Sequence, residues 1–368
     1  MTDAKPGPAP RPGVMNIAPY IVGGSKIAGA EKIIKLSANE NYWGASPKAV
    51  EAFRETGISL ADYPGADSAP LREAIAEVHE LDPARIICGN GSDELLQLLG
   101  YAYLQDGDEV VYSQHGFLLY PSYALMNGAT PVKAAETNLT SDVDALLAAC
   151  TEKTRIVYLA NPNNPTGTRL NGQELERLAA GIPESALLVV DAAYAEFVTG
   201  DDYDGGISLV NRRPNVVMTR TFSKIYGLAS LRVGWMYAHE SVLEVLHRIR
   251  GPYNVNGPAQ AAAAAAMRDV DYAKWCREET IRLRAKMTAD LAALGVACTP
   301  SEGNFVLADF GTDEATGAAA MDAAFKARGV IVRRMEGYGL PGHLRISIGD
   351  EAAGDAVAAA VAEFRGAA

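Results

Sequence analysis

The chain of 368 residues and 39.0 kDa is long enough for two domains, and its 48% hydrophobic and 21% charged residues are typical of a globular protein. A formal charge of -12 disfavours nucleic acid and anionic membranes as partners, because both require a basic surface. The four cysteines and five histidines are scattered, so neither a disulfide framework nor a metal site is predicted. Without a recognisable signal peptide or membrane span, we expect a cytoplasmic protein.

The N-terminal region is predicted to be an extended arm. Residues 1–14 contain four prolines, which disfavour regular secondary structure. The turn-forming run Asn39-Glu40-Asn41 follows a short apolar stretch. Ser46-Pro47 then predicts a helix, because serine can accept hydrogen bonds from the free amides and proline is tolerated in the first turn. The compact part of the chain should therefore begin near residue 46.

Helices and strands are predicted to alternate after the turn Tyr63-Pro64-Gly65. Apolar residues at helical spacing predict a helix over about residues 70–80. Residues 85–92 then indicate a short strand, a glycine turn and a helix start that Ser92 can cap, and the exposed amides there can bind an anion. Two glycines before a helix are a weak signal. They do not match the dinucleotide-binding fingerprint, which disfavours a Rossmann dehydrogenase.

An aromatic residue follows the next predicted strand, residues 109–112. Phe117 could cover a planar ligand ring, a contact worth about 1 kcal/mol. His115 is a tempting general base, but a lone histidine is more often structural, and we assign it no catalytic role.

Two apolar runs are predicted to be strands buried on both faces. Residues 154–160 lead into the loop 161–167, which is rich in asparagine and proline, and residues 187–191 end in an aspartate. A carboxylate at the end of an apolar strand needs a cationic or hydrogen-bonding partner. Asp191 is therefore a candidate ligand-binding residue.

Lys224 is the strongest candidate for a catalytic residue. It follows a predicted strand at 216–219, among the apolar neighbours that a Schiff-base nucleophile needs to lower its pKa. The hydroxyls of Thr221 and Ser223 and the planar fork of Arg232 suit a phosphate. In isolation, a surface lysine and a structural arginine would also explain these residues. Together they suggest an aldehyde cofactor that carries a phosphate.

The C-terminal third of the chain changes character. The elements predicted from residue 234 onward are a strand at 234–238, helices at 241–250, 261–268 and 271–294, strands near 296, 304–309, 330–333 and 344–348, and helices near 313–328 and 351–364. The long helix should link two domains, and the short elements after it are typical of a small α+β domain. Within them, Arg333 and Arg345 are candidate anion binders, because two guanidinium forks suit a phosphate or carboxylate.

Three runs resemble fold-type I pyridoxal-phosphate aminotransferases: the lysine run 221–235, the Asn-Pro-Asn-Asn-Pro-Thr-Gly loop and the arginine run 337–349. The form Ser-Lys-x-x-Gly-Leu-x-x-Leu-Arg looks most like the histidinol-phosphate aminotransferases. This resemblance implies an α/β fold. Its large cofactor-binding domain would span residues 46–275, with a mostly parallel sheet between helices. A small α+β domain would span 276–368, and residues 1–45 would form the arm and part of the small domain.

The resemblance also implies roles for individual residues. Lys224 would hold pyridoxal phosphate and act as acid and base, and Asp191 would keep the ring nitrogen protonated. Asn164 and Tyr194 would contact the ring oxygen, and Phe117 would stack on the ring. The phosphate would be bound by Ser92, Asp93, Thr221, Ser223, Arg232 and, in a homodimer with a shared active site, the partner subunit's Tyr63.

The activity implied by the resemblance is amino transfer between L-histidinol phosphate and 2-oxoglutarate in histidine biosynthesis. Tyr20, Arg333 and Arg345 would bind the anionic end of the amino donor. His115-Gly116-Phe117 departs from the pattern of many members and is similar to a subgroup active on aromatic amino acids, so an aromatic aminotransferase stays open. A decarboxylase of a phosphorylated amino acid also stays open. A non-catalytic module of a transcription regulator is disfavoured, because the chain has the lysine and lacks a basic DNA-binding extension.

Overall fold

The fold is built around a seven-stranded sheet in which β10 alone runs against its neighbours. The computed structural model describes residues 8–19, 24, 26–27, 33–58 and 60–366. The strand order is β2-β10-β9-β8-β7-β3-β4, and β10 is antiparallel to both β2 and β9. The strands are β2 (Ile86–Gly89), β3 (Glu109–Ser113), β4 (Thr130–Ala134), β7 (Thr154–Ala160), β8 (Leu187–Asp191), β9 (Val216–Thr221) and β10 (Gly234–Tyr237).

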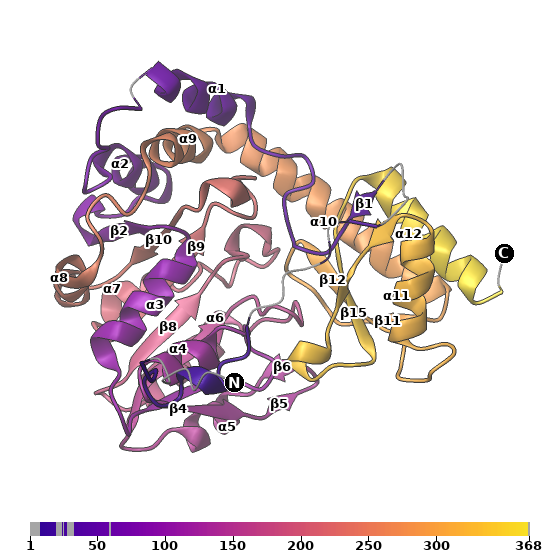
Figure 1. Ribbon diagram of the computed structural model, residues 1–368, viewed down its shortest axis with the longest axis horizontal. Helices are drawn as coiled ribbons and strands as arrows, with labels where there is room; N and C mark the ends of the chain where they lie inside the picture. Colours follow the sequence, from indigo (N-terminus) through magenta and orange to yellow (C-terminus); the bar gives the residue numbers. More distant parts are fainter. Residues whose placement is uncertain (1–7, 20–23, 25, 28–32, 59, 367–368) are drawn as a thin grey trace, which may run out of the picture.

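Helices pack on both faces of this sheet, because its central strands are apolar on both sides (Figure 1). Val157 and Leu159 of β7 belong to one buried core, whereas Ile156 and Tyr158 belong to the other. The first core includes α1 (Pro47–Glu55), α2 (Ala69–His79), α5 (Val143–Ala149), α6 (Gly172–Gly181), α7 (Ile207–Arg212) and α9 (Gly257–Arg268). The second includes α3 (Ser92–Tyr103), α4 (Tyr120–Met126) and α8 (Glu240–Ile249).

A second, smaller sheet forms near the C-terminus. Its four antiparallel strands have the order β11-β12-β15-β14. The strands are β11 (Ala297–Cys298), β12 (Phe305–Asp309), β14 (Arg333–Arg334) and β15 (His343–Ser347), and they pack with α11 (Ala318–Ala327) and α12 (Glu351–Phe364). The short strand β1 (Ile34–Lys35) pairs in parallel with β13 (Val330–Ile331), which brings the N-terminal region to this part of the fold.

The long helix α10 (Val270–Ala293) joins the two parts, as the sequence predicts (Figure 1). Cys276 lies in a core of the large sheet, whereas Leu283, Met287 and Leu291 lie in the core beneath the small sheet. The division into domains after residues 45 and 275 stays a prediction.

The remaining described elements are short. They are the hairpin β5 (Glu136–Thr137) and β6 (Thr140–Ser141) and the 3-10 helices η1 (Val14–Asn16), η2 (Thr56–Ile58), η3 (Pro83–Arg85), η4 (Ala195–Phe197), η5 (Ala229–Leu231) and η6 (Glu336–Tyr338). In the N-terminal arm, Nη2 of Arg11 donates to the carbonyl of Met126 at 2.5 Å, so this part of the arm lies against the end of α4. Within the described ranges, no helix combines the length and the apolar character that crossing a membrane requires.

Candidate active site

A cavity of about 290 Å³ lies at the carboxyl ends of β7, β8 and β9, where α/β proteins commonly bind ligands. Two arginines from the small sheet also line it. The predicted site residues in its lining are Ser92, Asp93, Phe117, Asn164, Asp191, Tyr194, Thr221, Ser223, Lys224, Arg232, Arg333 and Arg345. The fold therefore gathers these residues from distant parts of the sequence into one cavity. The predicted substrate-binding Tyr20 lies outside the described residues.

Asp191 is the last residue of β8 and is buried at the end of the sheet. Its Oδ2 accepts a hydrogen bond of 2.9 Å from the hydroxyl of Tyr120, and its Oδ1 accepts a longer one of 3.4 Å from Thr219. Burial raises the pKa of Asp191 to about 6, because little solvent stabilises the charged form. A cation bound in the cavity beside this carboxylate would lower this pKa and so favour the ionised form of Asp191.

Lys224 lies in the turn that follows β9, opposite Tyr194. Its Nζ donates to the carbonyl of Ala38 at 3.4 Å and lies 5.7 Å from the centre of the Tyr194 ring. The neighbouring Phe222 and Ile225 are buried, as the sequence predicts. The apolar neighbours thus hold the turn in place while the amine lines the cavity.

The start of α3 and the guanidinium of Arg232 form one end of the cavity. Nη1 of Arg232 donates to Oγ of Ser223 at 3.2 Å, and Nη2 donates to Oδ2 of Asp93 at 3.3 Å. Gly91 has φ +82°, a backbone conformation that side chains rarely adopt, and the guanidinium of Arg232 lies where a Cβ would be. The positive φ therefore favours glycine at this position. The free amides at the start of α3 and the arginine fork together suit a phosphate.

One detail of this turn differs from the sequence prediction. Ser92 is predicted to cap α3, but Gly91 occupies the cap position and Ser92 is the first helical residue. The positive φ of Gly91 allows the chain to turn into the helix without a side-chain cap. As a result, Ser92 lines the cavity instead of closing the helix end.

Arg345 lies at the side of the cavity formed by the small sheet. Its Nη1 donates to Oδ1 of Asn164, and its Nη2 donates to the carbonyl of Ser37 at 3.0 Å. Arg333 is directly opposite Arg345 on the neighbouring strand and also lines the cavity. Arg334 is not part of the described cavity lining and forms an ion pair with Glu336. This arrangement favours Arg333 over Arg334 as the second candidate anion binder.

Asn39 connects the N-terminal region to both sides of the cavity. It has φ +54°, and its Nδ2 donates to the hydroxyl of Tyr194 at 3.0 Å. Its backbone amide donates to Oγ of Ser347 at 2.9 Å, and Nδ2 of Asn304 donates to its carbonyl at 3.0 Å. Asn39 therefore holds the hydroxyl of Tyr194, and both residues line the cavity.

Phe117, Tyr120 and His115 lie in the segment that follows β3. The Phe117 ring makes an edge contact with Tyr120, with centroids 5.7 Å apart. His115 is buried, lies outside the cavity lining, and has its Nδ1 2.8 Å from Oε2 of Glu136. This pairing supports a structural role for His115. Tyr120 is the important residue that sequence reasoning missed, since only the fold brings its hydroxyl to Asp191.

Tyr63 lies away from the cavity. Its side chain is 81% exposed and stacks on Tyr253, with ring centroids 4.5 Å apart. Within one chain it therefore contributes nothing to the described cavity lining. Its predicted role in a neighbouring subunit stays a prediction.

Comparisons with known proteins agree with this geometry. The sequence model for aminotransferase class I and II matches residues 31–361. A curated histidinol-phosphate aminotransferase from Dinoroseobacter shibae is 52% identical over 356 residues, which cover 97% of this chain and 98% of that protein. Another from Rhodospirillum centenum is 51% identical over 360 residues, with coverage of 97% and 99%.

A solved structure is similar over the same extent. The crystal structure of histidinol-phosphate aminotransferase from Sinorhizobium meliloti in complex with pyridoxal-5'-phosphate has a TM-score of 0.84 and 28% identity, and the match covers 99% of this chain and 98% of that one. The predicted fold-type I architecture is thereby confirmed. The chain belongs to the class I and II aminotransferase family.

Proposed function

We propose that this protein is a pyridoxal-phosphate-dependent aminotransferase that moves an amino group between L-histidinol phosphate and 2-oxoglutarate in histidine biosynthesis. The carrying observation is that a chain about half identical to curated histidinol-phosphate aminotransferases has Lys224, Asp191 and two arginines around one cavity. The cytoplasm is the proposed location, in keeping with this metabolic role and the acidic composition.

The residues present fit the cofactor. Burial without a neighbouring cation raises the pKa of Asp191. A protonated ring nitrogen beside the carboxylate would be such a cation and would favour the ionised carboxylate. The opposite requirement, an anion site, is met by Arg232, the hydroxyls of Ser92, Thr221 and Ser223, and the amides that start α3. Asp93 would orient Arg232 through their hydrogen bond. Lys224 supplies the amine that would hold the aldehyde.

The ring would be bound between Phe117 and the neighbouring walls of the cavity. Oδ1 of Asn164 accepts from Arg345, which leaves the amide hydrogens of Asn164 as donors for the ring oxygen. The hydroxyl of Tyr194 already accepts from Asn39, so its own hydrogen is also available for that oxygen. These two donors would favour the ionised ring oxygen.

Proton transfer is assigned to Lys224. When bound, pyridoxal phosphate withdraws electrons and so stabilises the negative charge left on a substrate carbon that loses its proton. Nζ of Lys224 would take this proton and return it to the cofactor side, acting as base and then as acid. Asp191 would meanwhile hold the proton on the ring nitrogen through charge and hydrogen bonding.

The two arginines of the small sheet, Arg345 and Arg333, indicate which amino donor the cavity binds. Nε of Arg345 is buried and has no hydrogen-bond partner within the described ranges, and Arg333 lies on the adjacent strand. A phosphate offers two arginine forks more charge and more acceptor oxygens than a carboxylate. We therefore propose that Arg345 and Arg333, with Tyr20, bind the phosphate of L-histidinol phosphate.

The donor assignment predicts a measurable preference. With 2-oxoglutarate as acceptor, kcat/KM should be higher for L-histidinol phosphate than for phenylalanine or tyrosine, by about 100-fold if two charge-assisted contacts are lost. Arg333→Ala should remove most of this preference, whereas Arg334→Ala, which changes a surface ion pair, should keep it. A wild-type enzyme that favours phenylalanine or tyrosine would instead be an aromatic aminotransferase. Release of carbon dioxide in place of amine transfer would indicate a decarboxylase.

We also propose a homodimer in which each site is completed by the partner subunit's Tyr63. The support is that Tyr63 is a largely exposed aromatic residue, stacked on the half-exposed Tyr253, although large aromatic side chains are usually covered. A second copy of the chain would cover both rings and bring the hydroxyl of Tyr63 to the phosphate end of the other cavity.

Subunit mixing tests this proposal. Lys224→Ala and Tyr63→Ala proteins should each have little activity alone, but their equimolar mixture should recover about a quarter of the wild-type rate, because half of the dimers are mixed and one site in two is complete. Light scattering and mass spectrometry would verify the exchange. Full exchange without recovered activity would contradict a shared site.

A further inference from the structure

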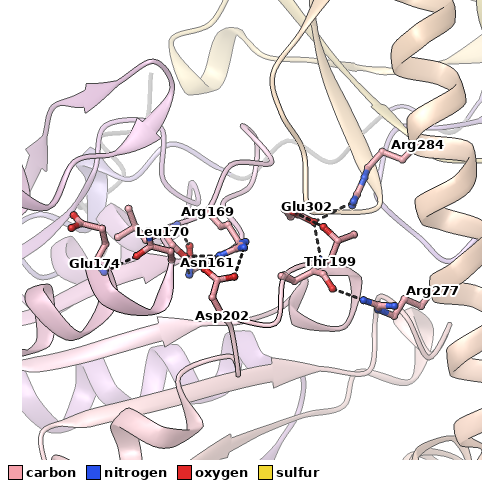
Figure 2. A network of polar contacts seen from close by, with 11 residues as sticks. Asn161, Arg169, Leu170, Glu174, Thr199, Asp202, Arg277, Arg284 and Glu302 are labelled. Carbon is pink, nitrogen blue, oxygen red and sulfur yellow. Dashed lines mark hydrogen bonds and ion pairs between the residues drawn. The ribbon is translucent and has the colours of Figure 1, made fainter.

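A polar junction outside the cavity connects the large sheet to the small one. Figure 2 shows its centre at Glu302, in the loop before β12. The carboxylate accepts two hydrogen bonds from Thr199, one of 2.9 Å from Oγ1 and one of 3.2 Å from the backbone amide of Thr199. It also accepts one of 3.2 Å from Nη2 of Arg284 in α10. Glu302 is not part of the described cavity lining.

Two arginines of α10 hold the backbone on either side of this carboxylate. The side chain of Arg284 is only 9% exposed, and its Nη1 donates to the carbonyl of Gly303 at 2.7 Å. Arg277 donates to the carbonyl of Val198 at 2.6 Å (Figure 2). Removing Glu302 would leave the buried guanidinium of Arg284 without its charged partner, which is a costly arrangement.

The loop that contains Glu302 is hydrogen-bonded to the loop that contains Asn164. The backbone amide of Glu302 donates to the carbonyl of Gly167 at 2.8 Å, and Oγ1 of Thr299 donates to the carbonyl of Thr166 at 2.5 Å. Gly167 has φ +79°, and a Cβ there would lie 2.9 Å from the backbone Cα of Ser301. Only glycine permits this close contact between the two loops.

Arg345 makes the second connection between the same two parts. Its strand β15 pairs with β12, with Leu307 opposite Arg345, and β12 begins three residues after Glu302. Arg345 then donates to the side chain of Asn164. The loop 161–167 is therefore attached to the small sheet at two points: outside the cavity through the backbone amide of Glu302 and the hydroxyl of Thr299, and inside it through Arg345.

We propose that the side chain of Glu302 is a positioning group. By holding Thr199 and Arg284 it fixes the loop whose backbone contacts Gly167, and so sets the place of Arg345 and Asn164 in the cavity. The inference rests on the proposed function, in which Arg345 binds the anionic end of the donor and Asn164 contacts the cofactor. An atom displaced by about 1 Å can cost a large factor in binding or rate, so a residue outside the cavity can control the site.

The test compares Glu302→Ala with Asp202→Ala in the cofactor-loaded enzyme. Asp202 also pairs with an arginine near this junction, Arg169 at 2.7 Å, but both belong to the large-sheet side (Figure 2). Glu302→Ala should raise the KM for L-histidinol phosphate about tenfold and change kcat less than about threefold, because an anion contact is loosened while Lys224 is untouched. Asp202→Ala should leave both unchanged.

A second measurement needs no substrate. The pH midpoint of the bound cofactor's visible absorbance should rise by about 0.5 unit in Glu302→Ala, since a displaced Asn164 stabilises the ionised ring oxygen less well. Glu302→Gln keeps an acceptor for Thr199 and should fall between wild type and Glu302→Ala. If the alanine variant does not fold, Thr199→Val and Glu302→Gln supply the same two measurements with smaller shifts.

The outcomes distinguish the proposed function from the positioning role of Glu302. A wild-type enzyme that transfers no amino group, with a midpoint that still shifts in Glu302→Ala, would remove the proposed function and keep the positioning role. A lower Tm with unchanged KM and unchanged midpoint would show that Glu302 only stabilises the fold. Equal effects of Glu302→Ala and Asp202→Ala would also overturn the inference.

Discussion

Lys224→Ala should fold normally but lose at least about 10⁴-fold in kcat, the upper range for removing one general acid and base. Lys224 is the only lysine among the described residues that line the cavity, so no other amine there can take over its role. Single-turnover absorbance changes after addition of L-histidinol phosphate would measure the loss. Borohydride reduction of the wild type, followed by peptide mapping, should place the pyridoxyl label on Lys224.

Lys35→Ala is the matched control for this experiment. Lys35 pairs with Glu40 at 2.7 Å, close to the N-terminal residues of the site, but is not part of the cavity lining. The control protein should keep its rate and its label on Lys224. A pyridoxyl label on any other lysine, or normal turnover in Lys224→Ala, would overturn the assignment.

Asp191→Asn should lower kcat by about 10³-fold, as expected when one preorganised electrostatic contact is lost from a water-poor site. Asparagine has the same shape and can still accept from the hydroxyl of Tyr120, so the sheet should remain intact. Only the negative charge is removed, and with it the ability to keep the ring nitrogen protonated. Steady-state kinetics and a thermal melt of the same sample would separate chemistry from folding.

Tyr120→Phe tests how much of this effect depends on the hydrogen bond. It removes the donor that lies 2.9 Å from Oδ2 of Asp191 but keeps the carboxylate. We expect a loss of at most about tenfold, roughly the value of one hydrogen bond to a charged group. If Asp191→Asn were no worse than Tyr120→Phe, the charge on Asp191 would have no part in catalysis.

Local sequence patterns predicted the parts of the site that lie on regular elements. The apolar runs that end at Ala160 and Asp191 coincide with β7 and β8, since strands buried on both faces leave a continuous hydrophobic signal. The turn around Lys224 was recognisable because its small, hydroxyl and apolar residues are close in sequence. In such segments, chemistry and local structure depend on the same few residues.

The remaining contacts depend on residues that are distant in sequence. Asn39 meets Ser347, and Tyr120 meets Asp191, only after the sheets and helices have packed. No periodicity in the chain records these pairs. The prediction that Ser92 caps α3 was wrong for a different reason, because the positive φ of Gly91 is a backbone property that the residue pattern does not specify.

The position of β2 has a consequence for the order in which the protein can acquire its binding site. This strand leads into α3 and its phosphate-binding turn, yet it lies at the edge of the sheet and pairs with β10, in which Gly234 faces Gly89. On the ribosome, β2 must wait until the chain has been synthesised past Tyr237, while β3, β4, β7 and β8 can already pair. A nascent chain released after Lys224 but before Tyr237 would therefore contain the lysine and lack the anchored turn that binds the cofactor phosphate.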